Sequence, residues 1–360
     1  MIPDPKAKQL FDRGNELYHA GDFEAASAHF QRSIRIEDHV GARLNLATAL
    51  AANRQFSEAF LIYETIKQFP RANCDYGVVE AYAGLNYRCF FARWLDRFKC
   101  SDESITLLKN AAKIKPYGGE NLDGKRLLFY CERACGDSIQ LLRYVQAIKA
   151  KYDVHVTVTC RQTLKELFKR CPSVDRVFTT WDEIDRERFD FWLASFTAPL
   201  VFDDPGPTKF NVEPIELDLL GKKIGICWTG DPGHIENHWR HIPVELLRPL
   251  TECGTLINLQ HDKTCQFAES FKINSFHYLA KLILACDVVV SIDTSVLHLA
   301  ASLGVPTFAL LAWKRAHWFP PSRDVCEWYP QMKLITQDKL NEWEPVIERV
   351  KSALYRSWTA

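Results

Sequence analysis

The chain has 360 residues, of which 47% are hydrophobic, so it can form two or three domains with complete cores. Lysine and arginine together number 45, as do aspartate and glutamate, and the formal net charge is therefore zero. This composition excludes a disordered chain and a small disulfide-stapled scaffold. It also lacks the net basic charge that would mark a nucleic-acid or anionic-membrane partner, so nucleic acid is the less favoured partner.

The amino terminus lacks the basic and apolar regions of a secretory signal, and we therefore expect a cytoplasmic protein. Its 12 cysteines show no paired CxxC spacing, which predicts reduced, mostly buried thiols. The stretch from Thr294 to Trp313 approaches the length of a membrane span, but Gly304 and Pro306 interrupt it. We predict a buried helix followed by a buried strand there, and no transmembrane segment.

The first third of the chain repeats a helical pattern. Phe23, Ala26 and Phe30 return as Phe56, Ala59 and Tyr63, each pair separated by about one 34-residue unit. This spacing resembles the tetratricopeptide repeat, in which small residues lie where two helices cross and large residues face each other. We expect a TPR-like helical domain over residues 1–118.

A third, degenerate repeat is expected to end at Lys115 and Pro116, with Leu95, Leu108 and Ala111 as its inward residues. Stacked helix pairs of this kind form a curved array whose concave face binds a peptide or packs on another domain. Two clear repeats leave both roles open. The array either recruits a peptide or protein partner or simply extends the neighbouring domain.

A cluster of chain breakers at 116–119 ends the helical pattern, and short apolar runs then alternate with amphipathic helices. This alternation predicts parallel sheets covered by helices. We expect a first Rossmann-like domain over 121–210 and a second over 215–355, with a proline-rich linker at 203–215. The predicted strands are 127–130, 154–158, 174–178, 223–228, 255–259, 288–292 and 307–311, and the predicted helices are 139–149, 164–170, 244–251, 276–285 and 295–303.

Ligands of such sheets bind beyond the carboxyl ends of the strands, so the loops there carry the candidate chemistry. In the first loop, Gly136 permits a close approach and Asp137 can project a carboxylate as a general base. The alternative is that Asp137 only caps the helix that follows it.

The second loop joins Trp228 to a run of polar residues. Thr229 and Gly230 can turn backbone amides toward a ligand, and Arg240 can bind a phosphate with its planar guanidinium. The alternative is a long polar loop with a surface arginine. Three histidines in this loop, two of them at helical spacing, also allow a metal site, although the stretch has no obvious carboxylate ligand set and no fixed helical frame: they are His234, His238 and His241.

The third loop follows a strand that ends at Ile292. A helix is predicted to begin after Asp293 and Thr294, so that its free N–H groups favour an anion such as a diphosphate. Thr294 or Ser295 adds a hydroxyl donor, and His298 lies one turn further along. The alternative makes Asp293 a helix cap and His298 a buried core histidine.

Together the three loops resemble glycosyltransferase family 9, the heptosyltransferase-like group, and in particular its members fused to tetratricopeptide repeats. The resemblance covers about residues 10 to 355. The matching residues are Glu132, Gly136, Asp137, Ile139, Gln140, Arg143 and Tyr144; Trp228, Gly230, Pro232, His234, Arg240, Ile242 and Pro243; Asp293, Thr294, His298, Leu299, Ala300, Leu303, Gly304 and Pro306; and Trp328, Tyr329, Pro330, Met332, Leu334 and Gln337.

The resemblance implies a GT-B pair of Rossmann-like domains and metal-independent, inverting transfer of a sugar from a nucleotide diphosphate to an acceptor hydroxyl. It implies no cofactor beyond that co-substrate, and Asp137 becomes the candidate base. The donor-binding residues that it implies are Thr229, Gly230, Arg240, Gln260, Asp293, Thr294, Ser295 and His298. Fixed hydrogen-bond donors and cations suit a leaving diphosphate when no metal neutralises it.

Several positions depart from the family pattern. Cys131 stands where the family has glycine, and Cys135 precedes Gly136, so the acceptor cannot be taken over from the family. Basic residues at 314, 315 and 317 follow the last strand, where they either reach the diphosphate or lie in solvent.

Three other functions stay open. The chain can be a nucleotide-sugar or partner-binding protein without turnover, a repeat-guided enzyme that glycosylates proteins, or one that glycosylates a modified nucleobase. The acceptor is accordingly a saccharide or a protein, with nucleic acid less favoured. No Walker loop, GxGxxG fingerprint or GxSxG elbow occurs in the sequence, which gives phosphotransfer, dinucleotide redox and serine hydrolysis no starting motif.

Overall fold

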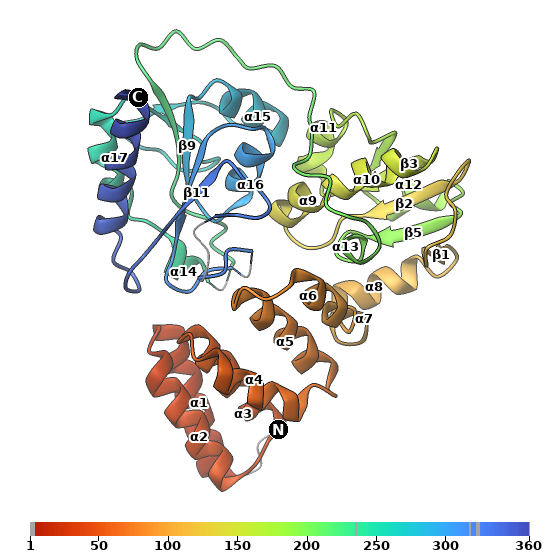
Figure 1. Cartoon of the computed structure of the whole chain (residues 1–360), viewed down its shortest axis with the longest axis vertical. Coiled ribbons are helices and arrows are strands. Elements are labelled where there is room, and N and C mark those ends of the chain that lie inside the picture. Colours follow the sequence, from red (N-terminus) through yellow and green to blue (C-terminus); the bar gives the residue numbers. More distant parts are fainter. Residues whose placement is uncertain (1–3, 235, 317, 322–324, 360) are drawn as a thin grey trace. The chain divides into compact units, whose positions relative to one another are not determined.

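The computed structural model describes residues 4–234, 236–316, 318–321 and 325–359, and its chain divides into two compact units (Figure 1). The first unit is helical and comprises Met1–Asn110 with Ala316–Arg323. The second contains two parallel sheets and comprises Ala111–Arg315 with Asp324–Ala360.

The helical unit consists of hairpins with short loops. Asp4 begins the first helix by accepting hydrogen bonds from the amides of Lys6 and Ala7, and Gly21 ends it at a φ of 85°. Asp22 then caps the second helix through the amide of Ala25, so a two-residue loop reverses the chain. The helices are α1 (Pro5–Ala20), α2 (Phe23–Ile36), α3 (Val40–Ala52), α4 (Phe56–Ile66), α5 (Pro70–Tyr82), α6 (Tyr87–Trp94), α7 (Arg97–Cys100) and α8 (Asp102–Asn110).

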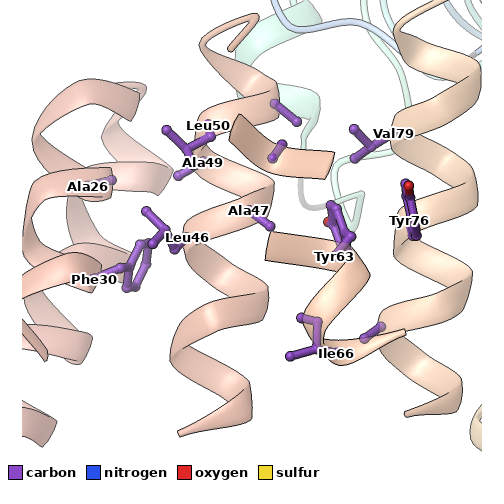
Figure 2. Close-up of a cluster of buried hydrophobic side chains, with 13 residues drawn as sticks. Ala26, Phe30, Leu46, Ala47, Ala49, Leu50, Tyr63, Ile66, Tyr76 and Val79 are labelled. Carbon is purple, nitrogen blue, oxygen red and sulfur yellow. The ribbon is translucent and has the colours of Figure 1, made fainter. Parts of the chain in front are cut away.

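The residues expected to pack between the first two repeats do so. Ala26 and Phe30 on α2 are buried in one core cluster (Figure 2), to which Ala59 on α4 also belongs. In the same cluster the ring of Tyr63 stacks on that of Tyr76, with centroids 5.2 Å apart. These contacts give the helical unit a core of its own.

The third repeat differs from the expectation. Leu95 and Leu108, expected to point inward, are 40% and 39% exposed, and only Ala111 is buried. Lys115 and Pro116, expected to end the helical domain, form strand β1 (Lys115–Pro116) and pair with Phe191 and Trp192 in the first sheet. The sheet therefore begins before the expected boundary at residue 118.

The helical unit also contains a short segment from the far end of the sequence. Trp318 is buried, and its ring contacts those of Phe90 and Phe91 at centroid distances of 5.9 and 6.2 Å. The hydroxyl of Tyr87 donates to the main-chain oxygen of Trp318 over 3.0 Å. Because α6 is so rich in aromatic side chains, it can hold this segment by burial of large rings.

The first sheet has the strand order β1-β5-β2-β3-β4, with every pair parallel. The strands predicted near 127, 154 and 174 are confirmed, whereas β5 was not predicted. The predicted helix 139–149 divides in two at Leu142. The elements are β2 (Arg126–Tyr130), α9 (Cys135–Leu141), α10 (Arg143–Lys151), β3 (His155–Thr159), η1 (Gln162–Leu164), α11 (Lys165–Phe168), β4 (Arg176–Phe178), α12 (Trp181–Asp185), β5 (Phe191–Ala194) and α13 (Ala198–Val201).

The second sheet has the order β11-β10-β9-β6-β7-β8 and is likewise parallel. The four predicted strands are confirmed, while the helix predicted at 244–251 is a 3-10 helix, and β8, β11 and α17 were not predicted. The elements are β6 (Lys223–Cys227), α14 (Asn237–Arg240), η2 (Val244–Glu252), β7 (Thr255–Asn258), β8 (Glu269–Ser270), α15 (Phe276–Leu284), β9 (Val288–Ile292), α16 (Ser295–Ser302), β10 (Thr307–Leu311), β11 (Met332–Thr336) and α17 (Glu344–Thr359).

The apolar stretch from Thr294 to Trp313 forms a helix followed by a strand, as predicted. Helix α16 ends at Ser302 and β10 begins at Thr307, and both are buried. Within the described residues, no helix combines the length and the apolar character that crossing a membrane requires.

Candidate functional site

The order of the strands brings two of the predicted loops together. In the second sheet β6 lies beside β9, with Cys227 opposite Ser291, although the chain visits β7 and β8 between them. Such a change of direction leaves the loops after the two strands side by side at the carboxyl edge. The Thr229 and Asp293 loops are therefore neighbours because of topology, not because of sequence proximity.

Gln260 holds the first of these loops in place. Its side-chain oxygen accepts hydrogen bonds from the amides of Trp228 and Thr229, each over 3.0 Å, and from the thiol of Cys227. Trp228 and Thr229 are both buried, so these amides need an acceptor within the protein. Gln260 was predicted to bind the donor, but its side-chain oxygen is used in hydrogen bonds to the loop.

Arg240 points into this edge of the sheet. Its Nη1 donates to the main-chain oxygen of Asp293 over 2.8 Å. A methyl group placed on Gly230 would lie 2.6 Å from Nη2 of the same guanidinium, so a larger residue there would force Arg240 to shift. The side-chain oxygen of Asn237, at the start of α14, accepts a hydrogen bond of 3.0 Å from the amide of Gly230. The structure therefore brings together Gly230 and Arg240, which the sequence placed ten residues apart.

The amino end of α16 begins at this point. Thr294 precedes the helix in an extended conformation, yet its side chain makes no capping hydrogen bond. Its hydroxyl instead lies 3.4 Å from that of Ser291 and 3.6 Å from the thiol of Cys227. The first-turn amides after Ser295 are thus not capped by Thr294, which is the arrangement that favours an anion at a helix start.

His298 is buried, and Asp293, whose side chain is 15% exposed, lies next to it. Oδ1 of Asp293 lies 3.8 Å from Nε2 of His298. Burial raises the pKa of Asp293 to about 6; the nearby Arg240 works against this shift, and Asp137 and Glu236 add to it. Burial, with the positive charge of Arg143, lowers the pKa of His298 to about 3. His298 is therefore neutral at physiological pH, and the contact is not an ion pair.

The first half of the sheet unit approaches the same helix through α9. A methyl group on Gly136 would lie 3.0 Å from Cδ2 of His298 and 3.6 Å from the Cα of Ser295. Asp137 follows in the first turn of α9, where its carboxylate accepts a long hydrogen bond of 3.4 Å from the amide of Ala134. Asp137 therefore does cap its own helix, and its charge is also close enough to Asp293 to raise the pKa of that group.

Two of the basic residues after the last predicted strand, Lys314 and Arg315, are bonded within the protein and not free in solvent. Lys314 forms an ion pair with Glu236 beside the Trp239 ring, and Arg315 donates to the hydroxyl of Thr336. Burial opposes the charge on Glu236, but the positive charge of Lys314 leaves its pKa below the usual value. His317 lies outside the described residues. Neither Glu236 nor Asn237 has a distinctive spacing in the sequence, and only the fold shows that both support the Arg240 loop.

The three histidines of this loop do not form a ligand set. Helix α14 begins at Asn237, so His234 and His238 do not share the helical frame that their spacing suggested. His238 instead contacts the Trp239 ring, at 4.6 Å between centroids. In the chain as described, no group of three or more His, Cys, Asp or Glu side chains is arranged to hold a metal ion.

Comparison with known families supports the resemblance. Residues 272–340 match the family model described as Glycosyltransferase family 9 (heptosyltransferase). This segment contains Asp293, Thr294, Ser295 and His298, and ends just beyond Gln337. Protein FlbA of Caulobacter vibrioides (strain ATCC 19089 / CIP 103742 / CB 15) is 24% identical over 405 residues, which cover 98% of this chain and 67% of that protein.

Solved structures show a likeness of fold. TibC, an iron-containing dodecameric glycosyltransferase from enterotoxigenic E. coli H10407, has a TM-score of 0.50 and 12% identity, over 66% of this chain and 78% of that one. The same figures hold for TibC described as a heptosyltransferase in complex with ADP-D-beta-D-heptose. Together with two parallel sheets covered by helices, this likeness supports the GT-B architecture, whereas the helical unit has no such support as a TPR domain.

Proposed function

We propose that this chain is a glycosyltransferase that moves a sugar from a nucleotide diphosphate to an acceptor hydroxyl, with inversion and without a metal ion; the match of residues 272–340 to the family 9 model supports this. The observation that carries the proposal is the amino end of α16, uncapped by Thr294 and flanked by Arg240. Amides and a guanidinium in this arrangement stabilise the charge that develops on a departing diphosphate.

The donor is proposed to lie against the second sheet. Thr229 and Gly230 present the loop after β6, and Thr294 and Ser295 present the loop after β9, at adjacent strand ends. Since TibC was solved with ADP-D-beta-D-heptose, an ADP-activated sugar is the first donor to test. The neutral imidazole of His298 and the carboxylate of Asp293 would orient the sugar or its diphosphate.

Asp137 is proposed to be the base that removes the proton from the acceptor hydroxyl. It lies in the first turn of α9, next to Gly136, which in turn faces His298 and Ser295. A general base of this kind contributes about 10² to 10⁴ in rate. The acceptor would be a saccharide or a protein, and the helical unit is proposed to be a TPR-like array that recruits this acceptor or a partner.

Donor binding is tested first, without any need to know the acceptor. Thermal unfolding is followed with ADP, UDP, GDP and CMP, and then with their sugar derivatives. A ligand at 100 times its Kd stabilises the native state by about 2.7 kcal/mol. We expect a nucleoside diphosphate to raise the Tm of the wild-type chain and to raise that of Arg240→Ala much less. An equal rise in the Tm of wild type and of Arg240→Ala would contradict the proposed diphosphate site.

Turnover is tested next. Slow hydrolysis of the bound donor by water is followed in wild type and in Asp137→Asn, which keeps the size and the capping acceptor but loses the base. We expect donor binding to persist and hydrolysis to fall at least about 100-fold. Binding without hydrolysis in the wild type would instead favour a binding protein that has lost turnover.

A further inference from the structure

A fully buried arginine connects the first half of the sheet unit to the candidate donor site. Arg143, at the start of α10, has no exposed surface. Its Nη1 donates to the carboxylate of Asp204 over 3.1 Å and to the main-chain oxygen of Trp328 over 3.0 Å, while Nε donates to the main-chain oxygen of Gln140. Since a buried charge is tolerated only with partners, this guanidinium is held in one position.

The same guanidinium lies against Tyr329. Its central carbon is 4.9 Å from the centroid of the Tyr329 ring, and Tyr329 is completely buried. The hydroxyl of Tyr329 in turn lies 3.3 Å from Nδ1 of His298. On the other side of the imidazole, Nε2 faces Asp293 at 3.8 Å. Four side chains thus form a row from α10 to the loop that precedes α16.

The charges at the two ends of this row decide which way its protons point. Arg143 only donates and repels a nearby hydroxyl proton, so the O–H of Tyr329 turns away from it. The hydroxyl of Ser302 next to Tyr329 can donate to the Tyr329 oxygen, which leaves Nδ1 of His298 as the acceptor for the Tyr329 proton. Nδ1 is then an acceptor, and the single proton of the neutral imidazole resides on Nε2, facing the carboxylate of Asp293. The opposite tautomer would aim the lone pair of Nε2 at that carboxylate and the hydroxyl proton of Tyr329 at a cation.

We propose that Arg143 and Tyr329 are positioning residues, which hold His298 in the tautomer with its proton on Nε2 and direct that N–H toward Asp293. The row fixes the imidazole at the point where Gly136 and Ser295 approach it. The contribution of this row to sugar transfer rests on the proposed function, whereas the tautomer of His298 does not depend on that function. Nothing in the reaction requires either residue to touch the donor.

The tautomer is measured directly in the full chain. Nitrogen chemical shifts of 15N-labelled histidine, recorded at pH 7.5, distinguish Nε2–H from Nδ1–H, and His298→Gln identifies the signals of His298 by their loss. We expect Nε2–H, with Nδ1 showing the shift of a hydrogen-bonded acceptor. In Tyr329→Phe, which keeps the buried ring, Nδ1 should lose that shift. A wild-type Nδ1–H tautomer, or a Tyr329→Phe spectrum identical to wild type, would overturn the proposal.

Kinetics then separate positioning from a purely structural role. We expect Tyr329→Phe to lower kcat by about 10- to 100-fold, because small displacements of a site group cost this much, with little change in the donor KM. Arg143→Lys keeps the charge but not the planar donor set, and its kcat should lie between those of wild type and Tyr329→Phe. Tyr117→Phe is the matched control, since this buried tyrosine contacts Tyr152 outside the site, and it should retain wild-type rates.

The outcomes distinguish this proposal from the proposed function. If no donor is turned over by the wild type, the proposed function fails, and the nitrogen shifts still decide the tautomer. If turnover is found and Tyr329→Phe matches the wild type in kcat, the positioning role fails while the glycosyltransferase reaction stands. A fall in kcat of Tyr329→Phe that is matched by Tyr117→Phe would also overturn it, because loss of any buried hydroxyl would then be sufficient.

Discussion

Nη1 of Arg240 donates to the main-chain oxygen of Asp293 over 2.8 Å, so the guanidinium is anchored on the turn that precedes α16. The anchor leaves Nη2 beside Gly230, on the loop after β6. One side chain therefore links two strand ends that adjoin each other in the sheet. In the proposed reaction this places a positive charge beside the helix amides where the diphosphate departs.

Replacing Arg240 tests this arrangement. Arg240→Ala should lower kcat by about 10² to 10³, the cost of losing one fixed donor to developing charge. Arg240→Lys should recover only part of the loss, because an ammonium cannot reproduce the planar donor set that spans Asp293 and Gly230. The measurement is kcat with saturating donor. Arg248→Ala is the control, since Arg248 lies on the surface with Glu245, and it should stay within about twofold of wild type.

The close approach of Gly136 to His298 gives a second prediction. The methyl group in Gly136→Ala would lie 3.0 Å from Cδ2 of His298, so the imidazole or α9 must move. We expect kcat to fall by about 10-fold or more, with a modest decrease in Tm. Gly118→Ala provides the comparison, because its methyl group would meet only Glu120, at 3.6 Å. Equal activities of the two variants would show that α9 tolerates displacement.

Gln260 separates a supporting role from direct donor binding. Gln260→Ala leaves the buried amides of Trp228 and Thr229 without an acceptor, at a cost of about 1–3 kcal/mol for each. Gln260→Glu keeps an oxygen for both amides and should restore most of the stability in urea unfolding. It should also restore donor affinity if Gln260 acts only on the loop. If the Gln260→Glu chain is stable but fails to bind donor, the side-chain NH2 group of Gln260 contacts the donor directly.

The neighbouring side chains of Asp293 and His298 predict opposite responses of stability to pH. The pKa of His298 is lowered to about 3, so the native state takes up its proton less readily than the unfolded chain. Its contribution to stability is complete above pH 6.5 and is lost as the pH falls toward 3. His298→Gln should therefore lose less stability than wild type between pH 7 and pH 4, measured by urea unfolding.

For Asp293 the sign is reversed. Its pKa is raised to about 6, so the native state favours the protonated carboxyl, and stability decreases as the pH rises from 3.8 through 6. Asp293→Asn should gain stability relative to wild type at pH 7.5 and less so at pH 4.5. A gain of the same size at both values would mean that this carboxyl titrates normally in the folded protein.

Much of this protein can be predicted from its sequence, because the information is local. Apolar runs bounded by Gly and Pro predicted the strands of both sheets apart from β1, β5, β8 and β11, and the 34-residue period predicted the core residues Ala26, Phe30 and Ala59. Motif spacing placed Asp293 and His298 around a strand end, and the family match over 272–340 agrees. These features depend on the period of the hydrophobic residues and on the turn residues, both of which are visible in the sequence.

What the tertiary structure alone decided is which distant groups meet and what protonation they adopt. No spacing reveals that Gln260 serves the amides of Trp228 and Thr229, or that Arg143 reaches Tyr329. Leu95 and Leu108 were misplaced because a period cannot show where a repeat ends and a new packing partner begins. Contacts between remote segments and the desolvation of Asp293 and His298 arise from burial, and burial is a property of the whole fold.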